Sequence, residues 1–183
     1  MKKFLLAATL LATTLAHAND EALLAEARKV AAELPPKLMA TLQEEMGKSG
    51  PEGAISVCKD MAPKAAADVL QRTGWKVKRV SLKPRNEARA IPDAWEQAAL
   101  EDFDKRAAAG ESPAKLEKGE KVGDEYRFVK ALPTQGLCLS CHGSAEQISP
   151  AVKAALAQHY ANDRATGYST GQIRGAISVR KGL

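Results

Sequence analysis

Cys138, Cys141 and His142 form a C-x-x-C-H motif, the one stretch of this 183-residue chain whose spacing prescribes a specific chemistry. Thiols three positions apart can each add to one vinyl group of haem, and the adjacent imidazole then binds the iron as an axial ligand. The motif therefore predicts one covalent c-type haem whose iron is bound by His142. A redox-active dithiol is the nearest alternative, but loop-forming residues at 133–136 and 143–144 flank the motif instead of a strand and a long helix.

The N-terminal residues indicate export. Lys2 and Lys3 precede an apolar run over residues 4–15, and Ala-His-Ala at 16–18 completes the pattern of a cleavable signal peptide. We predict a signal peptide over residues 1–18 and a single domain over residues 19–183. Because bacteria attach haem covalently outside the cytoplasmic membrane, we expect a periplasmic protein. No later segment offers the roughly 18 apolar residues of a membrane span.

The charge balance argues against a nucleic-acid partner. The chain has 27 basic and 22 acidic side chains, and loss of Lys2 and Lys3 with the signal peptide leaves 25 against 22. The sequence has no cluster of Lys and Arg with interleaved aromatic residues, which nucleic-acid binding would favour. Export would also separate the protein from nucleic acid. Arg79, Lys83 and Arg85 allow two interpretations, as cations that neutralise the haem propionates or as a solvated basic strand.

Haem attachment uses two of the three cysteines, so Cys58 is left as a lone thiol in an oxidising compartment. Such a thiol is protected when it is buried or coordinated. Cys58 lies on the apolar face of a predicted helix and is a candidate for the second axial ligand of the iron. His159, Met39, Met46 and Met61 are the alternatives, although a solvated histidine and core-filling methionines are common.

Apolar periodicity predicts an α+β fold. We expect helices over residues 20–48, 53–71, 92–109 and 149–160, with a break or bend at 35–36 and breaks at 50–52 and 63. Strands are expected over 75–82, 115–121, 125–132 and 173–180. Gly123-Asp124 predicts a β-hairpin between the two middle strands, and the last strand alternates as if half-buried. An all-helical cytochrome c fold is disfavoured because the attachment motif lies in the last third of the chain.

Five segments in order along the chain resemble one known family: residues 54–63, 79–86, 92–96, 167–171 and 175–179. This is the PAS-like c-type haem family, a domain of unknown function that occurs alone in exported proteins and as the extracytoplasmic sensor of histidine kinases and chemoreceptors. The resemblance implies a PAS-like antiparallel sheet with a long N-terminal helical arm and flanking helices. It also implies that His142 and Cys58 are the axial ligands. Residues 87–89 depart from the Pro/Asn-rich turn expected there.

That ligand pair predicts a redox or diatomic-gas sensor. A thiolate stabilises ferric over ferrous iron, so the reduction potential is expected to be low. Reduction weakens the iron–thiolate bond, and protonation of Cys58 would release it and open a position for NO or CO. A signal would then need a protein partner of unknown identity. Low-potential electron transfer is the alternative. The sequence shows no distal acid–base group of the kind that a peroxidase needs, so we expect no enzymatic activity.

Overall fold

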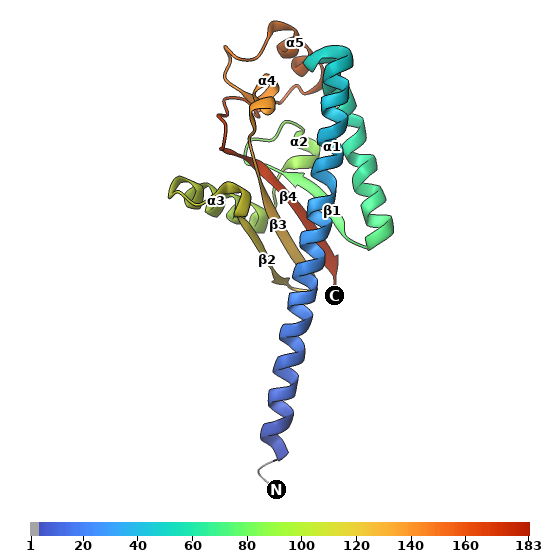
Figure 1. The fold of residues 1–183 in the computed structure, drawn as a ribbon, viewed down its shortest axis with the longest axis vertical. Coiled ribbons are helices and arrows are strands. Elements are labelled where there is room, and N and C mark those ends of the chain that lie inside the picture. Colours follow the sequence, from blue (N-terminus) through green and yellow to red (C-terminus); the bar gives the residue numbers. More distant parts are fainter. Residues whose placement is uncertain (1–3) are drawn as a thin grey trace.

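A four-stranded antiparallel sheet lies between a long helix on one face and a shorter helix on the other (Figure 1). This computed structural model describes the backbone of residues 4–183 and the side chains of residues 19–55 and 59–183. The predicted signal peptide, residues 1–18, falls outside the described side chains. Within the described part of the chain, no helix combines the length and the apolar character that crossing a membrane requires.

The elements follow the order that the periodicity predicts. They are α1 (Phe4–Thr73), β1 (Lys76–Val80), α2 (Glu87–Ala90), α3 (Ala94–Ala108), β2 (Glu117–Val122), β3 (Glu125–Pro133), α4 (Leu139–His142), α5 (Pro150–His159) and β4 (Ile173–Gly182), with 3-10 turns η1 (Pro113–Lys115) and η2 (Gly136–Cys138). The strand order is β1-β4-β3-β2, and every pair is antiparallel. The α+β class and the hairpin of β2 and β3 are therefore confirmed.

Helix α1 consists of two arms that meet at Gly50. The backbone of this glycine is non-helical, with φ 71° and ψ 175°, and Pro51 begins the second arm at the position where a proline is best tolerated. Figure 1 shows the first arm running along the sheet and the second arm returning beside it to β1. The break predicted at residues 50–52 is confirmed.

The break predicted at Pro63 is wrong, and Pro35-Pro36 do not break the helix either, because α1 remains helical through all three prolines. A proline inside a helix removes a hydrogen bond and costs about 3 kcal/mol. Leu34 before the first pair and Leu38 after it both pack into the core under the sheet, and the second arm joins the same core beyond its proline. Apolar packing on both sides thus offsets the lost hydrogen bonds.

Two cores cover the two faces of the sheet. The core on the α1 side contains Ala27, Val30, Ala31, Leu34, Val69, Trp75, Val77, Tyr126, Phe128, Ile177 and Val179. The core on the α3 side contains Val80, Ala99, Leu100, Phe103, Leu116, Val129, Ala131, Ile173 and Ala176.

The prediction that the last strand is half-buried is wrong. Arg174, Ala176 and Ser178, which alternate with the apolar residues of β4, are all buried. The reason is topological: β4 is a central strand, paired with both β1 and β3, and both of its faces are covered by helices. A buried arginine on a central strand has to find polar partners, and Arg174 finds them near His142.

A buried carboxylate fixes α3 to the sheet. Asp93 caps the helix, and Glu96 completes the capping box. Glu96 is fully buried, where it accepts from Ser178 Oγ at 2.7 Å and pairs with Lys78 Nζ at 2.8 Å. Arg127 pairs with Asp93 beside it. These cations and the hydroxyl balance the buried charge that α3 brings to the sheet.

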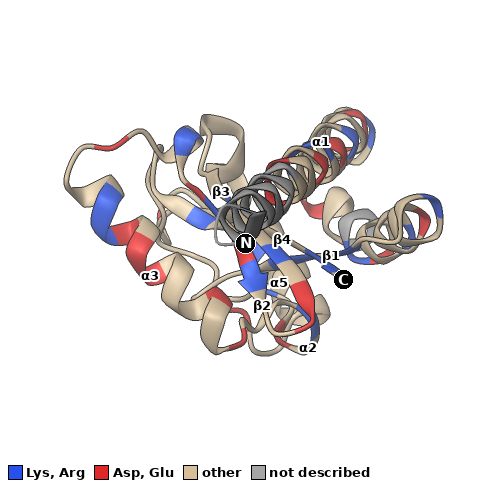
Figure 2. Ribbon diagram, turned by 90° about the horizontal axis from the view of Figure 1, so that it is seen from below, with Lys and Arg blue, Asp and Glu red and all other residues tan. Residues whose placement is uncertain are grey.

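Charges of both signs occur along α1 and along α3 (Figure 2). Several of them form pairs one helical turn apart, such as Glu44 with Lys48 and Asp102 with Arg106. This distribution agrees with the weakly basic, mixed surface expected from the composition.

We predict that Gly175→Ala is strongly destabilising. Gly175 has φ 149°, and a Cβ built there would lie 2.2 Å from the carbonyl oxygen of Val80 on the neighbouring strand. We expect a loss of about 3 kcal/mol or more in the free energy of unfolding, measured by urea denaturation. Gly123→Ala is the control, because its φ is 59° but its Cβ would meet nothing within 4 Å, so about 1 kcal/mol is expected. Equal losses in the two variants would contradict the steric explanation.

Candidate functional site

The C-x-x-C-H motif forms one tight turn at the end of β3. Cys138 ends η2 and precedes α4, and Cys141 and His142 are the last two residues of α4. Both thiols are free and half-buried. The dithiol alternative calls for a long helix after the cysteines, whereas α4 is only four residues long. Two thiols one helical turn apart, with an imidazole next to them, are the donor set that covalent haem attachment uses.

Cys141 packs against a small apolar cluster that joins three parts of the chain. The cluster contains Ile55 of α1 and Val152 and Leu156 of α5. Burial raises the pKa of the Cys141 thiol. Cys58 follows Ile55 by three residues, which is about one turn of α1, but its side chain lies outside the described residues. The structure thus brings the α1 segment that carries Cys58 to the motif and leaves the predicted ligand itself untested.

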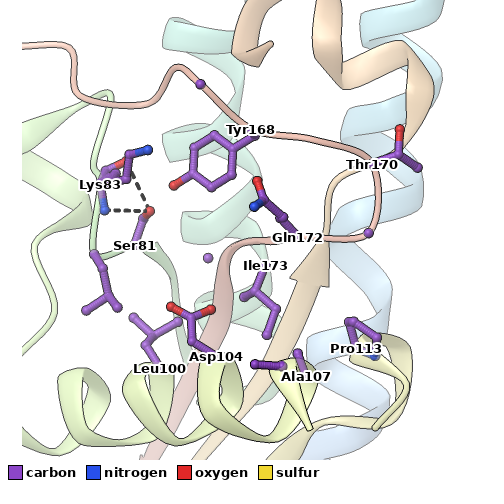
Figure 3. A pocket seen from close by; sticks show the side chains of 15 residues that line it. Ser81, Lys83, Leu100, Asp104, Ala107, Pro113, Tyr168, Thr170, Gln172 and Ile173 are labelled. Carbon is purple, nitrogen blue, oxygen red and sulfur yellow. Dashed lines mark hydrogen bonds between the residues drawn. The ribbon is translucent and has the colours of Figure 1, made fainter. Parts of the chain in front are cut away.

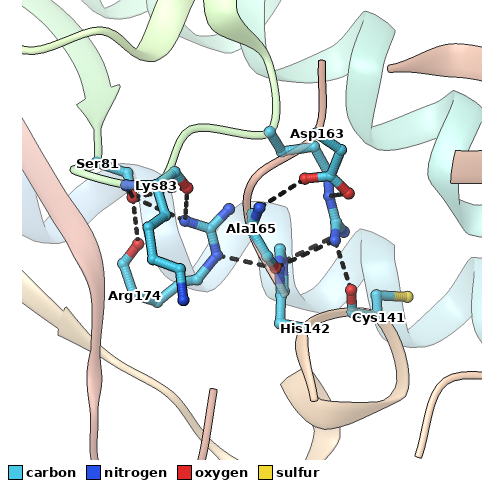
Figure 4. Close-up of polar contacts among 8 residues, drawn as sticks. Ser81, Lys83, Cys141, His142, Asp163, Ala165 and Arg174 are labelled. Atoms are coloured by element: carbon cyan, nitrogen blue, oxygen red, sulfur yellow. Dashed lines mark hydrogen bonds and ion pairs between the residues drawn. The ribbon is translucent and has the colours of Figure 1, made fainter. Parts of the chain in front are cut away.

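The hydrogen bonds of His142 decide which ring nitrogen can bind a metal. Nδ1 lies 2.6 Å from the carbonyl oxygen of Ala165 and 3.0 Å from Nε of Arg174 (Figure 4). A carbonyl oxygen can only accept, so the shorter contact requires a proton on Nδ1. Protonated Nδ1 then has no lone pair that could accept from the N–H of Arg174 Nε. Nε2 keeps its lone pair, with Arg85 Nη1 at 3.5 Å. A ligating histidine has this arrangement, since the second nitrogen donates to a carbonyl.

The surroundings keep the His142 imidazole neutral. Burial lowers its pKa well below the usual range, and the positive charges of Arg174, Arg85 and Arg79 lower it further. A neutral imidazole is the form that binds iron.

A second set of contacts holds the carbonyl of Ala165 in place. Asp163 accepts from the Ala165 N–H at 2.8 Å and from Arg85 Nε at 3.0 Å, and Arg85 Nη2 donates to the carbonyl of Cys141 (Figure 4). The Tyr168 N–H donates to the carbonyl of His142 at 2.9 Å. The segment before β4 is therefore tied to the motif by side chains and by backbone.

Two of the cations predicted near the haem, Arg85 and Lys83, have partners within the protein, and their predicted role toward propionates stays a prediction. Arg85 pairs with Asp163, and Lys83 donates to the carbonyl of Thr166 at 3.0 Å and lies 4.6 Å from the centre of the Tyr168 ring. Arg174, which strand periodicity placed on an exposed face, is instead 5% exposed beside His142. Burial lowers the pKa of its guanidinium to about 9, and the charge of Arg79 adds to this effect.

A cavity of about 770 Å³ lies between the segment of residues 85–91 and the end of α5. Arg85, whose Nη1 lies 3.5 Å from His142 Nε2, lines it, and so does Lys59, the neighbour of Cys58 in the chain, but none of the three motif residues does. The alternative ligand His159 lines the same cavity. Met61, by contrast, is 37% exposed.

A second cavity, of about 570 Å³, lies between α3 and the loop that leads into β4 (Figure 3). Asp104, Gln172 and Tyr168 contribute polar groups to it, and burial raises the pKa of the Asp104 carboxyl. Tyr168 also contacts the His142 ring edge-on, with the ring centres 6.4 Å apart. This cavity and the motif thus share one aromatic wall.

The residues present fit a covalently attached haem on two counts. The two thiols and the Nε2 lone pair of His142 form the required donor set. Arg174 is a buried cation without a carboxylate partner among the described residues, as expected next to a group that carries propionates.

Comparisons with known proteins agree with this geometry. The sequence model of the Tll0287-like family matches residues 7–181. The chain belongs to the Tll0287-like family. Among solved structures, the crystal structure of the cyanobacterial haem protein Tll0287 is similar, with 27% sequence identity, a TM-score of 0.56 and coverage of 67% of this chain and 71% of that one. No curated protein matches the chain. The family and the PAS-like α+β fold predicted from the sequence are confirmed.

We predict that Asp163→Asn destabilises the protein by about 3 kcal/mol. Asp163 and Arg85 are only 11% and 13% exposed, so the substitution leaves a nearly buried cation without its partner. Asp102→Asn is the matched control, because Asp102 and Arg106 form an exposed pair that contributes less than about 1 kcal/mol. Urea denaturation of both variants measures the difference. Losses of the same small size would show that the Asp163 pair does not support the site.

Proposed function

We propose that this protein is an exported c-type cytochrome of the periplasm that binds one haem and acts as a redox or diatomic-gas sensor. In this proposal Cys138 and Cys141 hold the haem covalently, and His142 and Cys58 bind the iron. The observation that carries the proposal is the arrangement of His142: Nδ1–H donates to Ala165, and Nε2 keeps its lone pair for a metal, with Arg85 Nη1 at 3.5 Å. The similar structure is that of a haem protein.

Each described residue has a distinct role in holding the group. Cys138 and Cys141 fix its position, and the backbone of α4 sets the separation of the two thioether bonds. His142 binds through Nε2 while the carbonyl of Ala165 fixes the ring and increases its basicity. A bound haem supplies one-electron chemistry and, at an open axial position, a site for a diatomic gas.

Cys58 is the labile donor in this account. Cys58 would hold ferric iron through its anionic Sγ, and would hold it less strongly once a one-electron donor had reduced the bound haem. By taking up a proton at Sγ, Cys58 would then be released and leave a position for NO or CO. The second arm of α1, which carries this residue, also packs against the sheet, so a change at Cys58 can be transmitted to a protein partner through that arm.

Electron transfer is the second candidate function. The half-buried thiols of the motif favour it, because a prosthetic group held there would lie near the molecular surface and accessible to a partner. The two functions differ in one observable. A carrier exchanges electrons rapidly and keeps both ligands, whereas the sensor loses Cys58 on reduction and binds CO. For neither function do we propose enzymatic activity.

We predict that the protein carries one covalent haem when it is produced together with an export and haem-maturation system. Denaturing mass spectrometry should give a polypeptide lacking residues 1–18 with one added haem mass. Replacing Cys138 and Cys141 by Ser should remove the added mass, because no thioether can then form. A wild-type chain with the mass of the polypeptide alone would contradict the proposal.

We predict that Cys58→Ser changes the ferric iron most strongly among the candidate ligands on the distal side. Low-spin thiolate signals in electron paramagnetic resonance should vanish and the reduction potential should rise, since an anionic donor has been removed. His159→Ala and Met61→Ala are the controls and should leave the ferric spectrum unchanged. If His159→Ala abolishes the spectrum while Cys58→Ser preserves it, the iron has two imidazole ligands and the labile-thiolate mechanism fails.

A further inference from the structure

The guanidinium of Arg174 is buried among neutral partners, including the Tyr168 ring, whose centre is 5.3 Å from Cζ. It is 5% exposed, and its Nη1 donates to two neutral acceptors, Ser81 Oγ at 3.0 Å and the carbonyl of Lys83 at 3.3 Å. A buried cation is normally paired with an anion, because burial without a partner costs several kcal/mol. Among the described residues, no carboxylate forms an ion pair with Arg174.

The carboxylate of Asp163 acts on Arg174 but is already paired with another cation. Asp163 accepts from Arg85 Nε with one carboxylate oxygen and from the Ala165 N–H with the other. Its charge is therefore balanced by Arg85. Arg174 remains as a surplus positive charge between β4 and the motif.

Two donor nitrogens of Arg174 lack an acceptor. Nε lies 3.0 Å from Nδ1 of His142, but Nδ1 carries the proton that it donates to Ala165 and cannot accept. Nη2 forms no hydrogen bond with a described residue, and Figure 4 shows it without a contact.

From these contacts we infer that Arg174 binds a haem propionate and thereby raises the reduction potential of the iron. A propionate is a carboxylate, the group that the planar donors of a guanidinium match best. Ser81 and the carbonyl of Lys83 position the guanidinium, and the cation beside the His142 ring favours the iron state of lower positive charge. This inference rests on the proposed function, because it needs a bound haem.

The inference is tested with two variants of Arg174 and one control in the haem-loaded protein. Arg174→Gln keeps donor groups but removes the charge, Arg174→Lys keeps the charge, and Arg180→Gln removes the same charge from an exposed position of the same strand, where Arg180 faces Glu125 at 3.7 Å. We expect Arg174→Gln to lower the reduction potential, Arg174→Lys to recover most of that shift, and Arg180→Gln to leave the potential at the wild-type value.

Vibrational spectroscopy provides a direct readout of the ion pair. The propionate bending mode in the resonance Raman spectrum should shift in Arg174→Gln and not in Arg180→Gln. If Arg174→Gln fails to retain haem, the wild-type protein alone still tests whether the ion pair forms. Its propionate mode should differ from that of the haem peptide released by proteolysis, in which the propionates are solvated.

Three results would overturn the inference. They are equal potentials in Arg174→Gln and Arg180→Gln, a wild-type propionate mode identical to that of the haem peptide, and a wild-type potential that changes with added inorganic phosphate, which would mean that Arg174 holds a free anion. Any of them in a chain that carries covalent haem leaves the proposed function intact. A chain without haem refutes the proposed function itself.

Discussion

The hydrogen bond from His142 Nδ1 to the carbonyl of Ala165 is the contact on which the rest of the site depends. It determines which nitrogen carries the proton and therefore which nitrogen can bind iron. The carbonyl can perform this role because the N–H of the same residue is also held. This N–H donates to Asp163, which is in turn paired with Arg85. A single buried ion pair thus sets the orientation of the imidazole.

The sheet supplies the rigid frame for these contacts. Strand β4 lies between β1 and β3 with α1 on one face and α3 on the other, so its residues have little freedom to move. Arg174 is the first polar residue of this strand and lies beside His142. The motif itself follows directly after β3, the neighbour of β4. Both sides of the site are consequently attached to adjacent strands of the sheet.

Local signals in the sequence predicted much of the fold. The caps of α3 and α5, the glycine turn between β2 and β3 and the Gly50-Pro51 break depend on neighbouring residues, and all are present. The prolines at 35 and 36 were misinterpreted because the packing that tolerates them comes from a sheet formed later in the chain. Non-local contacts of this kind leave no periodic trace in the residues concerned.

The same distinction applies to the site. The spacing of Cys138, Cys141 and His142 identifies the motif in the sequence, and the structure places all three residues in one turn. Asp163 and Ala165 belong to no sequence motif. Asp163 acts through its charge and Ala165 through its backbone. Arg174 alternates with apolar residues and so resembled an exposed residue. Its burial follows from the central position of β4, which only the strand order reveals.

The central claim is that His142 and Cys58 converge on one iron. X-ray absorption at the iron edge of the ferric, haem-loaded protein tests this claim directly, because it identifies the atoms bonded to the metal. The account predicts one short iron–sulfur bond, as a thiolate gives, among otherwise nitrogen neighbours. An iron environment made of nitrogen alone would contradict it and would assign the sixth position to the alternative ligand His159, which lines a cavity together with Arg85.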